Sequence, residues 1–304
     1  MTGPAVPAAG AGNGRYAPSP SSDLHLGNLR TAVVAWLAAR TSGRGFVLRI
    51  EDLDERSRPA IAQRQLADLS RLGIVPDAAP MVQSERLAVY QEVLSDLRER
   101  GLVYPCFCSR REILEAPRAP HAPPGAYPGT CRHLTAAERA AKAAVRPPAW
   151  RLAAGVTAWP VTDRLHGSFD GVVDDFVLAR ADGTPAYNLA VVVDDAAQAV
   201  TQVVRGDDLL SSTARQAYLG HLLGYTTPEY LHVPLVLNRA GQRLSKRDGA
   251  LAGPSLWENY GGAEGLLGAI GQSLGLASVR EVVTLPILAA RFDPDRLPAQ
   301  PWTV

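Results

Sequence analysis

The chain has 304 residues, 46% hydrophobic and 20% charged, which is the composition of a globular protein with one large or two modest domains. Its 31 basic and 30 acidic residues give a net charge of +1, so overall charge makes no case for nucleic-acid binding, although a local basic groove is still possible. No run of about 18 apolar residues is present, which excludes a membrane-spanning helix.

Residues 1–13 are rich in alanine, glycine and proline and lack the basic and apolar regions of a signal peptide, so we expect a disordered leader. Residues 14–28 form an extended segment, a Pro-Ser-Pro turn and a polar stretch, and residues 29–40 have helical periodicity. His25 and Gly27 stand where this helix begins. There a glycine lets a phosphate approach the helix N-terminus, and a histidine can donate to it. The alternative is a glycine that only shapes a turn.

Acidic residues follow the next expected strand, at residues 46–50. Glu51, Asp52 and Asp54 come directly after this apolar run. Ligands bind at the carboxyl ends of strands in open α/β sheets, so these carboxylates are placed to meet an amine, a ribose or Mg²⁺. The alternative is that they only begin a turn and cap the next helix.

Two amphipathic helices come next. Ser57, with Pro59 two residues later, predicts the N-cap of a helix that ends at Gly73. Ser84 heads another helix, which Gly101 closes. Strands alternating with helices at this spacing predict βαβ units and a parallel sheet.

Residues 103–148 form an insert rich in proline, glycine and arginine, with too few apolar residues for a core of its own. A bound metal would organise such a segment. The chain's three cysteines all lie here; their odd number argues against a disulfide framework and fits a reducing cytoplasm. Zinc takes four ligands, and on general grounds histidine leads among the candidates for the fourth. The thiolates are Cys106, Cys108 and Cys131, and the fourth ligand is His121, Tyr127, His133 or water. The alternative is three small hydrophobic thiols.

Two apolar runs within residues 175–195 flank an Asp-Gly pair, which is typical of a hairpin. The second run is either a buried strand or a buried helix, since periodicity does not separate the two. Tyr187 and Asn188 interrupt it with polar groups, which either satisfy the core or line a pocket.

A strand at residues 199–204 ends in Arg205, which is placed to bind a carboxylate or else to pair with Asp208. We expect a helix at residues 211–223 and a buried strand at residues 234–237.

The glycine-flanked basic loop at residues 238–249 suits closure over a polyphosphate, with Lys246 as a mobile point charge. A solvated surface loop is the alternative, but the His-x-Gly helix start upstream favours the phosphate role. A helix at residues 263–274 begins the short tail.

These motifs resemble a known family. The Pro-Ser-Pro turn followed by His25-Leu26-Gly27-Asn28 resembles the HIGH signature of class I aminoacyl-tRNA synthetases, and Arg243-Leu244-Ser245-Lys246-Arg247 resembles their KMSKS loop. The strings around Glu51, Tyr187 and Arg205 resemble the glutamyl branch, and the resemblance covers residues 14–260. Asn28 departs from the second histidine of HIGH.

The cysteine pattern with Tyr127, and the short tail after the loop, are similar to the glutamyl-Q tRNA(Asp) synthetase family, truncated paralogues of glutamyl-tRNA synthetase. This resemblance implies one zinc per chain with tyrosine, not histidine, as the fourth ligand. It implies activation of glutamate with ATP and Mg²⁺ without tRNA, and then transfer to queuosine at the wobble position of tRNA(Asp). It also implies a cytoplasmic monomer without an anticodon-binding domain.

The resemblance assigns roles to individual residues. The residues that bind glutamate are Arg15, Ser19, Glu51, Tyr187 and Arg205. ATP is met by His25, Gly27, Asn28 and Lys246, of which His25 and Lys246 are catalytic. Zinc is held by Cys106, Cys108, Tyr127 and Cys131. Separately from the resemblance, Arg110, Arg111, Arg118 and Arg132 near the insert are candidates for contacts with tRNA phosphates, and the alternative for each is a solvated surface side chain.

The implied fold is a Rossmann-like α/β catalytic domain with a zinc-bearing insert and a short helical tail. We expect a leader, a first Rossmann-like half, the insert, a second half with the KMSKS-like loop, and the tail: residues 1–13, 14–102, 103–148, 149–250 and 251–304. The alternatives are a truncated glutamyl-tRNA synthetase that charges a 3′ end, a small-molecule nucleotidyltransferase of the HxGH fold, and a catalytically silent paralogue.

Overall fold

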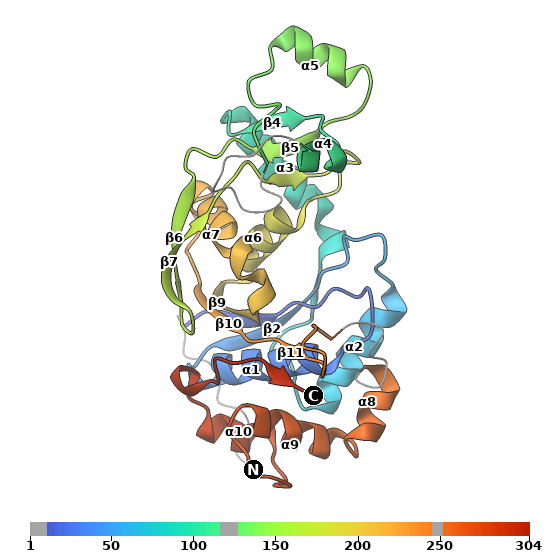
Figure 1. Ribbon diagram of the computed structural model, residues 1–304, viewed down its shortest axis with the longest axis vertical. Helices are drawn as coiled ribbons and strands as arrows, with labels where there is room; N and C mark the ends of the chain where they lie inside the picture. Colours follow the sequence, from blue (N-terminus) through green and yellow to red (C-terminus); the bar gives the residue numbers. More distant parts are fainter. Residues whose placement is uncertain (1–10, 116–126, 245–251) are drawn as a thin grey trace.

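A seven-stranded sheet with strand order β3-β2-β1-β9-β10-β6-β7 forms the centre of the computed structural model, which describes residues 11–115, 127–244 and 252–304 (Figure 1). Neighbouring strands run parallel, except that β7 is antiparallel to β6. The expected mostly parallel α/β sheet is therefore confirmed. The strands are β1 (Asn13–Tyr16), β2 (Gly45–Ile50), β3 (Met81–Val82), β6 (Ala158–Asp163), β7 (Gly167–Val172), β9 (Val200–Gly206) and β10 (Glu229–Val233).

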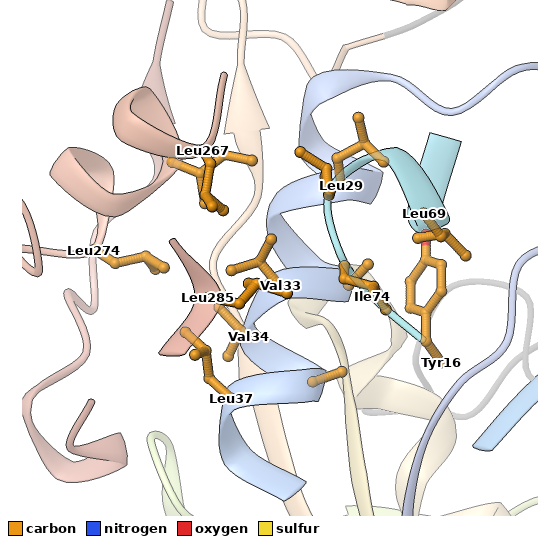
Figure 2. Packing of buried hydrophobic residues seen from close by; sticks show 14 of the residues in the cluster. Tyr16, Leu29, Val33, Val34, Leu37, Leu69, Ile74, Leu267, Leu274 and Leu285 are labelled. Atoms are coloured by element: carbon orange, nitrogen blue, oxygen red, sulfur yellow. The ribbon is translucent and has the colours of Figure 1, made fainter. Parts of the chain in front are cut away.

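Helices cover both faces of this sheet (Figure 1). One face carries α1 (Leu26–Thr41), α2 (Pro59–Arg71), α8 (Gly253–Asn259), α9 (Ala263–Ser273) and α10 (Leu285–Arg291). Figure 2 shows Val33 and Leu37 of α1 near side chains of the C-terminal helices, such as Leu285. The other face carries α3 (Leu87–Glu99), α6 (Tyr187–Ala197) and α7 (Thr213–Leu222). Short 3₁₀ turns lie at Gln83–Arg86, Asp207–Ser212 and Pro294–Arg296.

The insert is built on a second, three-stranded antiparallel sheet. Strand β4 (Val103–Cys106) pairs with β5 (Ala149–Leu152), and β5 pairs with β8 (Val177–Ala179). Helices α4 (Arg110–Glu115) and α5 (Ala136–Ala143) lie beyond it, at the top of Figure 1. Two carboxylates just before β8 accept hydrogen bonds from residues of the insert. Asp175 accepts from the Tyr104 hydroxyl at 2.6 Å, and Asp174 accepts from the Tyr127 amide at 2.9 Å.

The C-terminal residues pair with the strand that leads into the basic loop. Strand β12 (Trp302–Thr303) lies parallel to β11 (Val236–Leu237). The Trp302 amide donates to Leu235 O at 3.1 Å, and the Val304 amide donates to Leu237 O at 3.0 Å. Among the described residues, no helix is long and apolar enough to cross a membrane.

Several local expectations differ from the structure. The second apolar run is helix α6, and only an isolated bridge between Ala179 and Pro185 closes the expected hairpin. The N-cap of α2 is Arg58 rather than Ser57, because the Ser57 amide bonds back to Asp54 O and the turn ends one residue later. Ser84 lies in a 3₁₀ turn, and α3 begins after it.

Candidate active site

The candidate site lies where the strand order reverses. Strand β1 lies between β2 and β9, and the helices that follow β1 and β9 pack on opposite faces. Such a switch point leaves a crevice at the carboxyl ends of the strands, where ligands bind in open α/β sheets. A cavity of about 490 Å³ opens there. Every described residue expected to bind glutamate or ATP lines it, namely Arg15, Ser19, His25, Gly27, Asn28, Glu51, Tyr187 and Arg205.

His25 is the N-cap of α1 and forms a capping box with Asn28. Its ring Nδ1 accepts from the Asn28 amide at 3.3 Å, and the Asn28 Oδ1 accepts from the His25 amide at 3.1 Å. Because Nδ1 is an acceptor, the ring proton lies on Nε2, and this N–H group can donate a hydrogen bond to an anion. A Cβ on Gly27 would lie 3.0 Å from the His25 ring, so a glycine there lets the ring keep this position.

Arg15 and Glu51, which also line the cavity, belong to a buried ionic cluster. Arg15 Nε lies 3.3 Å from Asp195 Oδ1, and Arg49 Nη1 lies 2.7 Å from the same oxygen. Glu51 pairs with Arg49 at 3.2 Å. Arg49 is fully buried, so this cluster fixes the position of Glu51 at the cavity wall.

The pKa values of Glu51 and Asp195, two of the carboxylates in this cluster, shift in opposite directions. Burial raises the pKa of Glu51 and outweighs the attraction of Arg49. Burial also opposes ionisation of Asp195, but Arg15 and Arg49 outweigh it and lower the pKa of Asp195. Glu51 is therefore the carboxylate whose charge is least satisfied by the protein.

Arg205 is buried near the end of β9, and no carboxylate in the described part of the chain forms an ion pair with it. The expected alternative, an ion pair with Asp208, is wrong, because Asp208 pairs with Arg243. The Tyr187 hydroxyl lies 3.4 Å from Arg205 Nη1. Asn188 instead accepts from the Gln216 amide at 3.0 Å, so of the two polar residues in this run Tyr187 lines the cavity.

The remaining acidic residues act as turn and cap residues. Asp52 accepts from both the amide and the hydroxyl of Ser84, and Asp54 pairs with Arg56 at 2.8 Å. Neither lines the cavity. Of the three carboxylates after β2, the structure thus brings only Glu51 to the site.

The basic loop reaches the cavity through Arg243, while Leu244 is buried beneath it. Lys246, three residues further on, lies outside the described residues, as do Arg118 and His121. Among the expected tRNA-contacting residues, Arg132 is paired with Asp175 at 2.9 Å, and Arg110 is exposed on α4.

A cluster of three cysteines in the insert can hold a metal ion. The Sγ atoms of Cys106, Cys108 and Cys131 lie within 4.8 Å of one another. A tetrahedral site with Zn–S bonds of about 2.3 Å puts the sulfurs about 3.8 Å apart, so the cluster fits with small adjustments. The Tyr127 hydroxyl lies 3.3 Å from Cys106 Sγ and 3.5 Å from Cys108 Sγ, whereas His133 is not part of the cluster. Tyr127, the fourth ligand that the resemblance implies, therefore lies beside the thiols.

Sequence reasoning missed several residues that shape the site. Asp195, Asp208 and Arg243 lie within the motifs of the sequence. However, the ion pair of Asp195 with Arg15 and that of Asp208 with Arg243 depend on strand order and loop position. His232 and Asp163 lie on strands β10 and β6, which were not expected. No local pattern marked these two residues.

Comparisons with known proteins agree with the geometry. Residues 13–263 match the catalytic domain of class I tRNA synthetases (E and Q). The glutamyl-Q tRNA(Asp) synthetase of Nocardia farcinica is 58% identical, over 96% of this chain and 92% of that protein. That of Symbiobacterium thermophilum is 43% identical, over 95% and 94%.

A solved structure has the same fold. A crystal structure of a glutamate tRNA ligase from Elizabethkingia meningosepticum, in complex with its amino acid, superposes with a TM-score of 0.81 at 26% identity. The match covers 96% of this chain and 67% of that one. The chain belongs to the class I aminoacyl-tRNA synthetases and, within their glutamyl branch, to the glutamyl-Q tRNA(Asp) synthetase family.

Proposed function

We propose that this enzyme activates glutamate with ATP, without tRNA, and transfers it to queuosine at the wobble position of tRNA(Asp). The observation that supports this most strongly is the convergence of eight expected glutamate and ATP residues on one cavity, in a chain of this family. The work of the protein is to position two anionic substrates and to stabilise charge.

In the first step, the α-carboxylate of glutamate attacks the α-phosphorus of ATP, and pyrophosphate leaves. The Nε2–H group of His25 donates a hydrogen bond to a phosphate oxygen, and Lys246 supplies a point charge to the β- and γ-phosphates of Mg²⁺-ATP. Arg205 binds the side-chain carboxylate of glutamate, and Glu51 binds its ammonium group. Arg15, Ser19 and Tyr187 complete the amino-acid site, and Gly27 and Asn28 complete the ATP site.

In the second step, a hydroxyl of the queuosine cyclopentenediol attacks the carbonyl carbon of the glutamyl-adenylate, and AMP leaves. The anticodon loop enters the same cavity, since the wobble base must reach the adenylate and loop bases can be splayed out. Arg110, Arg111, Arg118 and Arg132 are the proposed phosphate contacts.

We propose zinc as the metal of the insert, held by Cys106, Cys108, Tyr127 and Cys131, where it stabilises the fold. We also propose that residues 103–148 form this insert between two Rossmann-like halves, residues 14–102 and 149–250, with residues 251–304 as a helical tail. The reaction takes place in the cytoplasm, with the chain as a monomer.

The decisive experiment measures transfer of labelled glutamate to three substrates: queuosine-containing tRNA(Asp), the same tRNA without queuosine, and tRNA(Glu). Only the first should accept glutamate. It should still do so after its 3′-terminal adenosine is removed. Charging of tRNA(Glu), or loss of acceptance on removal of that adenosine, would instead identify a truncated glutamyl-tRNA synthetase.

Lys246→Ala tests the first step in ATP–pyrophosphate exchange driven by glutamate alone. Loss of a charge that stabilises the transition state should slow exchange about 100- to 1000-fold. Lys142→Ala, on the exposed helix α5, is the matched control and should exchange normally. Equal rates for the two variants would refute the role of Lys246. No glutamate-dependent exchange by the wild type would refute the synthetase reaction itself.

A further inference from the structure

The described protein groups that accept hydrogen bonds from the Arg205 guanidinium are all neutral. The side chain is 5% exposed, and four of its five N–H groups have protein partners. These acceptors are His232 Nε2 at 3.0 Å, Gln216 Oε1 at 2.6 Å, Thr213 Oγ1 at 2.9 Å and Tyr187 OH at 3.4 Å. Within residues 11–115, 127–244 and 252–304, no aspartate or glutamate forms an ion pair with Arg205.

The arginine on the neighbouring strand, unlike Arg205, does have a carboxylate partner. Arg15, also at the cavity, lies beside Asp195, which neutralises it. A buried guanidinium without a counter-charge is costly, because burial removes its hydration. Arg205 thus keeps a positive charge at the cavity wall that a bound anion can neutralise.

His232 is the partner that explains how this charge is preserved. It lies directly opposite Arg205, on β10, and is fully buried. Its Nδ1 lies 2.6 Å from Asp163 Oδ2. Asp163 also accepts from the backbone amides of Leu165, His166 and His232, so it is an anionic acceptor.

This arrangement fixes the tautomer of the imidazole. Since Nδ1–H donates to Asp163, the lone pair is on Nε2 and accepts from Arg205 Nε. Burial also lowers the pKa of His232, which keeps the ring neutral. A protonated ring would have no acceptor for Arg205 and would place a second positive charge beside it.

We propose that His232, fixed by Asp163, is a positioning residue for Arg205 that sets the selectivity for glutamate over glutamine. This inference rests on the proposed function, in which Arg205 binds the side-chain carboxylate. His232 orients the guanidinium without neutralising it, so a ligand carboxylate completes the charge balance. The neutral amide of glutamine would leave the buried guanidinium without a counter-charge.

The test is glutamate-dependent ATP–pyrophosphate exchange by full-length variants, with KM measured separately for glutamate and ATP. His232→Leu removes the acceptor. It should raise the glutamate KM about tenfold to hundredfold, the usual effect of losing a hydrogen bond to a charged group, and leave the ATP KM unchanged. The ratio of kcat/KM for glutamate over glutamine should fall.

Two further variants distinguish positioning from support of the fold. The side-chain amide of His232→Gln reaches the position of Nε2 and can still accept from Arg205, whereas that of His232→Asn reaches only the position of Nδ1. His232→Gln should restore most of the glutamate affinity, and His232→Asn should not. This pair also decides the question if His232→Leu fails to fold. Equal glutamate KM values for Gln and Asn, or a parallel rise in both KM values, would overturn the proposal.

Arg205→Leu separates this inference from the function on which it rests. If Arg205→Leu leaves the glutamate KM unchanged, the assignment of glutamate to Arg205 fails, whatever His232 does. If Arg205→Leu raises it and His232→Leu does not, only the positioning role fails. The proposal requires both variants to raise the glutamate KM.

Discussion

Glu51 is proposed to bind the ammonium group of glutamate, and its negative charge is unfavourable in the folded chain. Its carboxylate is paired with Arg49, yet burial still raises its pKa, so the ionised form is disfavoured in the folded chain. The ammonium group of a bound glutamate would supply the missing positive charge. Glu51 therefore carries a cost in the free protein that its ligand relieves.

Glu51→Gln should accordingly make the free protein more stable at neutral pH. The pKa of Glu51 in the folded chain lies above the ordinary value of 4.5. The side chain therefore stabilises the folded chain while it is protonated, below that value, and this stabilisation is lost as pH rises through the folded-state pKa. At pH 7 the charged side chain destabilises the fold, and glutamine removes the charge while keeping an acceptor for Arg49. Thermal unfolding at pH 7 and near pH 4.5 should show a gain at pH 7 that shrinks in acid.

The same variant should lose glutamate affinity by about tenfold or more, since a charge-assisted contact is removed. Calorimetric titration with glutamate measures this. Asp54→Asn, in the exposed turn outside the cavity, is the control and should bind glutamate normally. If the Glu51→Gln variant is less stable at pH 7 than the wild type, the charge of Glu51 does not destabilise the free protein, and this explanation is wrong.

At the scale of elements, the helix that follows β1 was predictable because its cap, glycine and apolar spacing are all local. The apolar run after Tyr187 was not, since its length and composition suit either a strand or a helix, and packing against α7 gives a helix. Strand β10 was not predicted because His232 interrupts its short apolar run, and the partners that satisfy this buried histidine, Asp163 and Arg205, lie on neighbouring strands. The residues of β6 alternate in burial, but Pro160 obscured the pattern.

The pairing of β12 with β11 makes a prediction about the end of the chain. Deleting residues 302–304 removes backbone hydrogen bonds that hold the strand before the basic loop, at about 0.5–1.5 kcal/mol each, and the packing of Trp302 and Val304 against the core. Val236 and Arg243 line the cavity, so we expect lower stability and a several-fold higher KM for ATP in pyrophosphate exchange.

Thr303→Ala is the control for this deletion, because it keeps the backbone pairing and removes only an exposed side chain. Its KM for ATP should equal that of the wild type. If the deletion variant also keeps the wild-type value, β12 has no influence on the ATP site.

At the scale of the whole molecule, the insert and the cavity are structurally separate. Among the described residues, none that lines the cavity belongs to residues 103–148, and the insert lies at the opposite end of Figure 1 from α9 and α10. The cysteine spacing predicted the cluster, because a metal site is a local pattern. The Tyr127 contact came from the family resemblance, since chemistry alone favours histidine.

Removal of the proposed zinc should therefore affect the two proposed steps unequally. Elemental analysis should find about one zinc per chain, and Cys108→Ser or a strong chelator should lower it. Transfer to tRNA(Asp) should fall strongly, because the proposed phosphate contacts lie in the insert, while glutamate-driven exchange should keep most of its rate. Ser109→Ala, next to the cluster, is the control for zinc content. A metal-free chain that transfers glutamate normally would refute this role.

The position of β1 between β2 and β9 has a consequence for synthesis on the ribosome. Strand β1 pairs with β2 soon after both emerge, but its other edge stays open until β9, some 185 residues later, is made. An open strand edge is a template for wrong pairing, and contacts between distant residues form slowly. The nascent chain thus carries the β1 side of the cavity as an unprotected strand edge until β9 is made, and wrong pairing is most favoured during this interval.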